Sequence, residues 1–151
     1  MSLAKNTARV GPPPQGIVDV WCDPKRWPAF IEGFARVAEL DAGWPELGSR
    51  AVWESIPQGR GRVSERVVES GPTRFVVDVA EDDLEGVQTF SVAPDGEGGS
   101  LLRLELDYRL LKSGPLGGLT DVLFIRRALA AALGRTLERF AVEAAHEAAD
   151  R

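Results

Sequence analysis

The stretch LLRLELDYRL, residues 101–110, decides the fold, because apolar and polar side chains alternate from its second position to its end. Such alternation is typical of a β-strand with one buried and one solvated face. After Lys112-Ser113-Gly114-Pro115, an alanine-rich segment over residues 119–149 predicts one helix of about 45 Å. Its apolar side chains recur every three or four positions, at Val122, Ile125, Leu129, Leu133, Leu137, Phe140 and Ala144. Such a helix must cover something, and the apolar face of the sheet is the available partner.

Upstream of this strand, residues 49–111 have the pattern of successive strands. Turn-forming residues separate them at 57–59, 70–72, 81–83 and 94–99. Connections this short join antiparallel neighbours. The sequence therefore predicts an antiparallel sheet that precedes the long helix.

Two short helices are predicted before these strands. The first follows the prolines at 12–14, whose fixed φ suits a helix entrance. The second begins at Asp23-Pro24, where the carboxylate caps free N–H groups, and ends near Gly33. Residues 1–10 predict a first strand with frayed ends, and residues 36–40 predict a half-buried strand. The fold class is therefore α+β, with a curved antiparallel sheet of about six or seven strands around a long C-terminal helix.

Composition bounds the class of protein. The 151 residues, 44% hydrophobic and 27% charged, predict a single domain over 1–151 with a packed core. A net charge of -5 and a pI of about 5.0 provide no basic field, so nucleic acid is not expected as a partner. No apolar run is long enough to cross a bilayer. Without a secretory signal or a pair of cysteines, a cytoplasmic location is expected.

Residues with the usual chemistry of active sites are scarce. His146 is the only histidine and Cys22 the only cysteine, so a histidine-based triad in the body of the domain and a zinc site are excluded. Residues 81–85 are acidic, but they predict an exposed hairpin rather than a cation site. The glycines at 59, 61, 117 and 118 do not have the spacing of a phosphate-binding loop. We expect no metal and no cofactor, and a small, buried, unreactive side chain at Cys22.

Three stretches carry a family resemblance. Residues 20–28, VWCDPKRWP, look like a helix-Asp-Pro-x-x-Trp-Pro turn; the others are LDYRL at 106–110 followed by GPLG at 114–117, and RTLERF at 135–140. With the order of elements, they resemble the SRPBCC or START-like superfamily over nearly the whole chain, specifically its polyketide cyclase/dehydrase and lipid-transport branch. The resemblance implies a helix-grip fold with a hydrophobic cavity between sheet and helix, open near the two short helices.

Large apolar and aromatic side chains on elements that should converge are the candidate lining of that cavity. Any of them is equally compatible with an ordinary core. The candidate ligand-binding residues, polar ones included, are Trp27, Phe30, Trp53, Arg66, Phe75, Gln88, Phe90, Tyr108, Leu129 and Leu133.

Strand register decides which polar side chains face the cavity. Gln88 points inward if Phe90 does, and Glu54 points inward if Val52 does. Residues 63–68 are ambiguous, since either Glu65 or Arg66 fits an inward position, and Arg66 is favoured. Tyr108 is inward by the alternation of its strand, and its hydroxyl can orient a ligand carbonyl.

Three functions follow as hypotheses. The first is a protein that binds a hydrophobic small molecule such as a lipid, polyketide, isoprenoid or aromatic compound. The second is a polyketide aromatase/cyclase or dehydratase, in which Tyr108, Arg66, Glu54 or Gln88 moves protons or orients the chain. The third is an interaction module, a homodimer included, that uses Trp44 beside Pro45 as an anchor. Whether the protein is an enzyme is left open.

Overall fold

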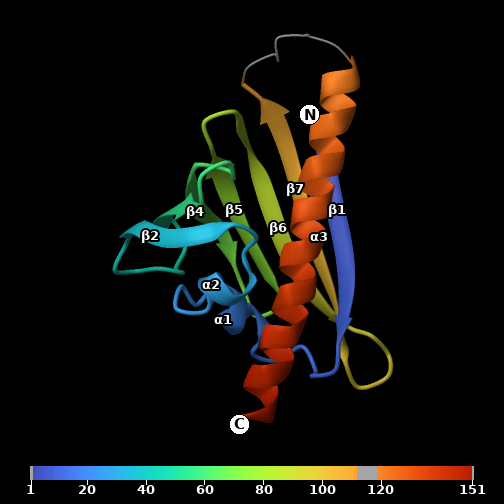
Figure 1. Cartoon of the computed structure of the whole chain (residues 1–151). Coiled ribbons are helices and arrows are strands. Elements are labelled where there is room, and N and C mark those ends of the chain that lie inside the picture. The colour runs from blue at the N-terminus through green and yellow to red at the C-terminus, as the bar shows by residue number, and fades with distance from the viewer. Residues whose placement is uncertain (1, 112–118, 151) are drawn as a thin grey trace.

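The structure, a computed structural model, describes residues 2–111 and 119–150, and the side chains of the last helix from Leu123 onward. Its elements follow one another along the chain as in Figure 1: β1 Ser2–Val10, α1 Ile17–Cys22, α2 Trp27–Phe30, β2 Phe34–Leu40, β3 Arg50–Ser55, β4 Arg62–Ser70, β5 Arg74–Ala80, β6 Leu84–Pro94, β7 Ser100–Leu110 and α3 Leu119–Ala149. The predicted α+β class and helix-grip architecture are confirmed.

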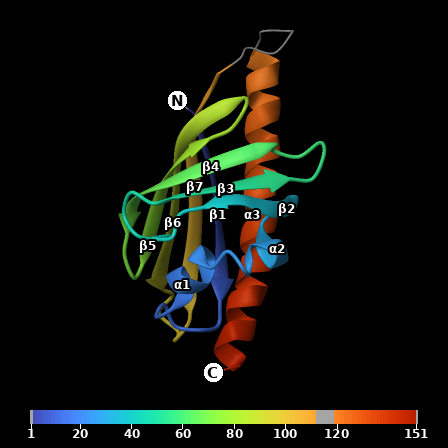
Figure 2. The ribbon, with the colours of Figure 1, turned by 90° about the vertical axis from the view of Figure 1, so that its left-hand side faces the viewer.

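The strands form one curved sheet whose neighbours are all antiparallel. Seven strands pair in the order β1-β7-β6-β5-β4-β3-β2. In Figure 2, β2, β3 and β4 run across the direction of β1 and β7, so the sheet bends around the face that α3 covers. The first strand, predicted to be frayed, is instead paired with β7 along its whole length, from Ser2 opposite Tyr108 to Val10 opposite Ser100.

The strand that decided the prediction behaves as expected. In β7 the side chains of Leu102, Leu104, Leu106 and Tyr108 are at most 1% exposed, and the residues between them face outward. Gly86 of β6 lies directly opposite Tyr108. A Cβ at Gly86 would lie 2.3 Å from the Asp107 carbonyl oxygen, so only glycine allows β6 and β7 to approach this closely.

The long helix packs on β1 and against α2. The Asn6 side-chain amide of β1 donates to the Ala130 carbonyl at 2.6 Å, and a Cβ at Gly134 would lie 3.2 Å from the same amide. Of the predicted apolar face, Leu133, Leu137, Phe140 and Ala144 are buried, while Ile125 and Leu129 are half-buried. The Val122 side chain and residues 112–118, including the 114–117 stretch of the family resemblance, lie outside the described part of the chain.

The first short helix, Ile17–Cys22, follows the prolines at 12–14 as predicted, but the second differs from the prediction at its start. The second helix begins at Trp27, with a proline in its first turn, rather than at Asp23-Pro24. The Asp23 carboxylate instead accepts a hydrogen bond from the Lys25 amide at 3.1 Å and so stabilises the turn before the helix.

Within the described residues, no helix is long and apolar enough to cross a membrane.

Candidate ligand cavity

Four aromatic rings from four elements meet between the sheet and α3. Trp21 of α1 stacks on Phe90 of β6, with ring centroids 4.3 Å apart and planes 3° from parallel. Phe140 of α3 presents its edge to both rings, and also to Phe30 of α2, at 5.0–5.3 Å. This aromatic cluster, Trp21, Phe30, Phe90 and Phe140, fixes the short helices and α3 against the sheet.

A small, partly open cavity lies beside the aromatic cluster. The space that the centre of a water molecule can occupy within it is about 30 Å³, enough for one or two waters and too small for an aromatic ring system. Its lining combines large apolar side chains with four polar ones: Trp21, Trp27, Phe30, Ile31, Trp53, Arg60, Glu65, Phe75, Gln88, Leu104, Leu133 and Thr136.

Glu65 places a carboxyl group inside this cavity. Its side chain extends from β4 between Val63 and Val67, whose exposure is 0% and 1%, and Glu65 itself is 9% exposed. The indole N–H of Trp53, on the neighbouring strand, donates to Glu65 Oε2 at 2.8 Å. Burial raises the pKa of Glu65, opposed by the Trp53 hydrogen bond and by the positive charge of Arg60. The environment therefore favours the neutral acid.

Arg60 covers the same end of the cavity. Its guanidinium carbon lies 5.5 Å from the centroid of the Trp53 ring, a cation–π arrangement. The guanidinium also pairs with Glu81, whose side chain is only 6% exposed. Burial raises the pKa of Glu81, while Arg60 lowers it. Arg60 thus already has an anionic partner.

Gln88 is the other polar side chain on the inner face of the sheet at this end. It is 8% exposed, in register with Val77 of β5 and Leu106 of β7, and it lines the cavity. No described residue hydrogen-bonds to its side-chain amide. The inward orientation predicted for Gln88 together with Phe90 holds.

The prediction that Arg66 faces the cavity is wrong. Glu54 was predicted to face the cavity only if Val52 points inward, and that condition is not met. In β4, Val63, Glu65 and Val67 share the buried face, so Arg66 points outward, where it donates to the Gly48 carbonyl at 3.2 Å. In β3 the inward residue is Trp53. Glu54 therefore lies on the outer face, where it pairs with Arg36 and Arg62.

The remaining candidates divide between the cavity and its surroundings. Trp27, Phe30, Trp53, Phe75, Gln88 and Leu133 line the cavity. Phe90 lies behind Trp21 in the aromatic cluster, and Leu129 is half-buried nearer the start of α3.

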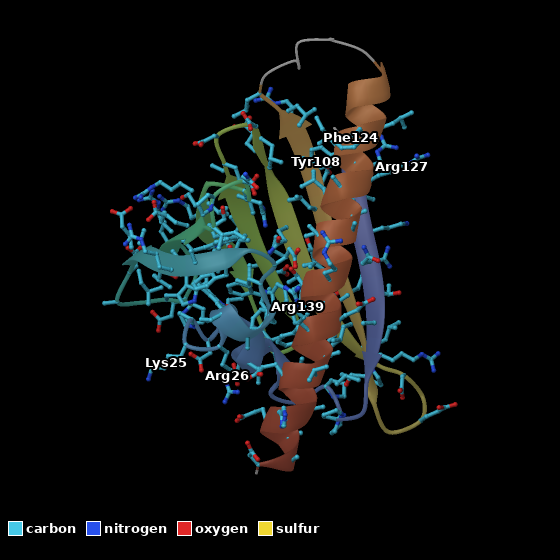
Figure 3. All side chains as sticks on the ribbon, in the orientation of Figure 1. Lys25, Arg26, Tyr108, Phe124, Arg127 and Arg139 are labelled. Atoms are coloured by element: carbon cyan, nitrogen blue, oxygen red, sulfur yellow. The ribbon has the colours of Figure 1, made fainter. Side chains whose placement is uncertain are left out.

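Tyr108 is inward as predicted but lies away from this cavity, between β7 and the N-terminal half of α3 (Figure 3). Its side chain is 1% exposed and, within the described residues, its hydroxyl has no hydrogen-bond partner.

Five lining residues were missed by the sequence reasoning, namely Trp21, Ile31, Arg60, Leu104 and Thr136, and a sixth, Glu65, was the alternative to Arg66 that was not favoured. Two of them had a signal. Leu104 belongs to the alternating face of β7, and Trp21 lies on the apolar face of the first short helix. Arg60 had none, since a glycine-flanked arginine in a turn is normally solvated.

Two side chains singled out for reactivity or binding, Cys22 and Trp44, are structural. Cys22 is 4% exposed and burial raises the pKa of its thiol, which opposes thiolate chemistry. The Trp44 indole donates to the Cys22 carbonyl at 2.9 Å and packs edge-on against Trp27 and Phe75, so it closes the local core. Among the described residues, no three metal-ligating side chains cluster.

Helix-grip proteins that enclose a cavity between sheet and helix are the class that this architecture defines. Residues 3–145 match the family described as polyketide cyclase/dehydrase and lipid transport. The chain therefore belongs to this family. No curated protein matches the chain in sequence.

Several solved structures share the fold. The di-domain aromatase/cyclase StfQ from the steffimycin biosynthetic pathway superposes with a TM-score of 0.77 at 17% identity, covering 99% of this chain and 52% of StfQ. The protein TTHA0849 from Thermus thermophilus gives 0.75 at 17% identity, covering 97% and 99%. The ZhuI aromatase/cyclase from Streptomyces sp. R1128 gives 0.71 at 15% identity, covering 95% and 93%. At these identities the likeness concerns the fold.

Proposed function

We propose that this protein binds a flat, hydrophobic small molecule, of polyketide or other aromatic type, between the sheet and α3. The observation that carries the proposal is a cavity walled by Trp21, Trp27, Phe30, Trp53 and Phe75 into which a carboxyl and an amide project. Binding sites for small molecules typically combine such an apolar wall with a few convergent polar groups. The family description and the names of two structural neighbours, both aromatase/cyclases, support the same class of ligand.

Binding requires the cavity to widen. The present space holds one or two waters, so an aromatic ligand displaces side chains of the lining. Trp21 and Phe30 line the cavity from the short helices α1 and α2, and their displacement would cost their contacts with Phe90 and Phe140. Their displacement changes the surroundings of buried tryptophans, which gives an optical signal for binding.

The experiment is native mass spectrometry of the purified protein, followed by solvent extraction of any bound molecule. An extracted aromatic compound that rebinds the emptied protein, with a change in tryptophan emission, supports the proposal. Leu133→Trp fills the cavity and is expected to abolish rebinding. Phe124→Ser, at a side chain 72% exposed on the same helix, is the matched control and should bind as wild type. A protein that carries nothing and takes up no aromatic compound contradicts the proposal.

An enzymatic role as an aromatase/cyclase or dehydratase is the second candidate, and Glu65 is the observation that favours it. A buried carboxyl held neutral at the wall of a cavity is suited to donate a proton to a carbonyl oxygen and to recover one from an adjacent carbon. Conversion of a bound poly-β-keto compound, lost in Glu65→Gln while binding persists, would establish this role. Unchanged turnover in Glu65→Gln would remove Glu65 from it.

A further inference from the structure

One oxygen of the buried Glu65 carboxyl has no protein partner. Oε2 accepts the Trp53 indole hydrogen, while no described residue hydrogen-bonds to Oε1. In the neutral acid, the oxygen that accepts a strong hydrogen bond is the carbonyl-like one, so the proton lies on the other oxygen. Glu65 therefore offers an O–H donor from Oε1 at the wall of the cavity. Because Glu65 lines the cavity, an acceptor atom of a ligand placed there can receive this hydrogen bond.

The charges around Glu65 determine what kind of ligand fits. The titratable or charged side chains that interact electrostatically with it are Arg60, Glu81 and Cys22. Arg60 is paired with Glu81, so that pair contributes no net charge. An anionic ligand would lose its water shell beside a guanidinium that Glu81 already engages, whereas a cationic ligand would lie beside that guanidinium. A neutral ligand meets neither penalty.

We infer that the ligand is a neutral aromatic molecule whose carbonyl oxygen accepts a hydrogen bond from the Glu65 carboxyl. The inference rests on the proposed function and narrows its ligand class. Glu65 lines the cavity, where the centre of a water molecule can occupy about 30 Å³, so a group as small as a carbonyl oxygen can reach its carboxyl. The aromatic ring system of the ligand would occupy the space that the Trp21 and Phe30 side chains now fill. Gln88, which lines the same cavity, supplies a second hydrogen-bonding group for a ligand with two polar atoms.

The experiment compares four naphthalenes of similar shape on the full-length protein: 2-acetylnaphthalene, naphthalene, 2-naphthoate and 2-(aminomethyl)naphthalene. Affinities are measured by calorimetry and tryptophan emission at pH 6. The ketone is expected to bind about tenfold more tightly than the hydrocarbon, the worth of one buried hydrogen bond, and more tightly than either charged compound.

Two variants separate the hydrogen bond from mere shape. Glu65→Leu should erase the preference for the ketone over naphthalene, whereas Glu65→Gln, whose amide still donates, should keep most of it. The ratio of two affinities within one protein is insensitive to a modest loss of stability, and circular dichroism confirms the fold of each variant.

The outcomes are distinct. If naphthalene or the acid binds wild type as tightly as the ketone, or if Glu65→Leu keeps the ketone preference, the inference is overturned and the proposed function stands. If none of the four compounds binds, the proposed function fails for this ligand class and the inference fails with it.

Discussion

The two halves of α3 are one continuous helix with different surroundings. The C-terminal half buries Leu133, Leu137, Phe140 and Ala144. Among residues 123–132 none is fully buried, and Leu123 and Phe124 are 42% and 72% exposed. Helical periodicity is present throughout, so the difference comes from what lies opposite each half rather than from the helix itself.

Ion pairs follow the same division. Arg26, before α2, pairs with Glu143 and Glu147, and Glu32 pairs with Arg135 and Arg139, so the segment containing α2 is linked to the C-terminal half of α3. The Glu32 amide also donates to Thr136 Oγ1 at 3.0 Å. The N-terminal half has Asn6 of β1 as its hydrogen-bonded neighbour. We conclude that the C-terminal half anchors the helix, while the N-terminal half covers the sheet more loosely.

The largest expected loss of stability follows a substitution in the C-terminal half of α3. Phe140→Ala removes the ring that contacts the other three members of the aromatic cluster and should lower the free energy of unfolding by about 3–5 kcal/mol. Phe124→Ala, the same change in the loose half, should alter it by no more than about 0.5 kcal/mol. Urea unfolding of both variants measures the contrast. Equal losses would show that the two halves are packed alike.

The next effect concerns pH and Glu65, the carboxyl of β4 that lines the cavity together with Leu133 of the anchoring half of α3. Because burial raises the pKa of Glu65 in the folded state, the folded protein holds a proton that the unfolded chain releases, so stability falls as pH rises above the ordinary value of 4.5. Glu65→Gln removes this contribution. Its stability relative to wild type should therefore increase with pH until the raised pKa is passed. Glu81, shifted in the same direction, leaves a residual slope in both proteins. Parallel stability curves would show that Glu65 is ionised in the folded state.

A substitution at Tyr108 of β7 tests how the N-terminal half of α3 packs on the sheet. Its buried hydroxyl has no partner among the described residues, so Tyr108→Phe should leave the ligand-free protein as stable as wild type or more stable, by up to about 1 kcal/mol. Thermal unfolding by calorimetry gives the sign. A destabilised variant would mean that the hydroxyl has a hydrogen-bond partner in solution.

The smallest effect is expected at the ion pairs of the anchor. Arg26→Gln removes a half-exposed guanidinium that faces Asp23, Glu143 and Glu147, and should cost about 0.5–1 kcal/mol at low salt. The loss should shrink as sodium chloride is added, because screening weakens exposed pairs. A loss that salt does not change would assign the role of Arg26 to packing.

The fold was predictable because its elements differ in period and in the residues that end them. Leu102 to Leu110 alternate so regularly that one register buries all the apolar side chains, and the short turns then force antiparallel neighbours. The paired state of β1 was not predictable. Ser2 to Val10 have no clear pattern, and their partner is a strand about a hundred residues away.

The residues of the candidate site could be predicted only on strands whose register could be predicted. Both faces of residues 63–68 carry a charged and an apolar side chain, and a rule based on polarity cannot choose between Glu65 and Arg66. The choice is made by Trp53 on the adjacent strand, whose indole hydrogen satisfies a carboxylate oxygen and would oppose a guanidinium. Contacts between strands of this kind are not visible in the pattern of a single strand.

The pairing of β1 with β7 also constrains how the chain acquires its structure. During synthesis, residues 2–10 are made before the rest of this domain, and their hydrogen-bonding partner at 100–110 and the helix that packs on them follow only about a hundred residues later. Until then β1 is an unpaired strand and the inner face of the sheet is open to solvent. Since contacts between distant residues slow folding, this domain should complete its fold only after β7 and α3 have been made, rather than strand by strand. The chain is therefore most prone to aggregate, and most available to chaperones, before β7 and α3 have been made.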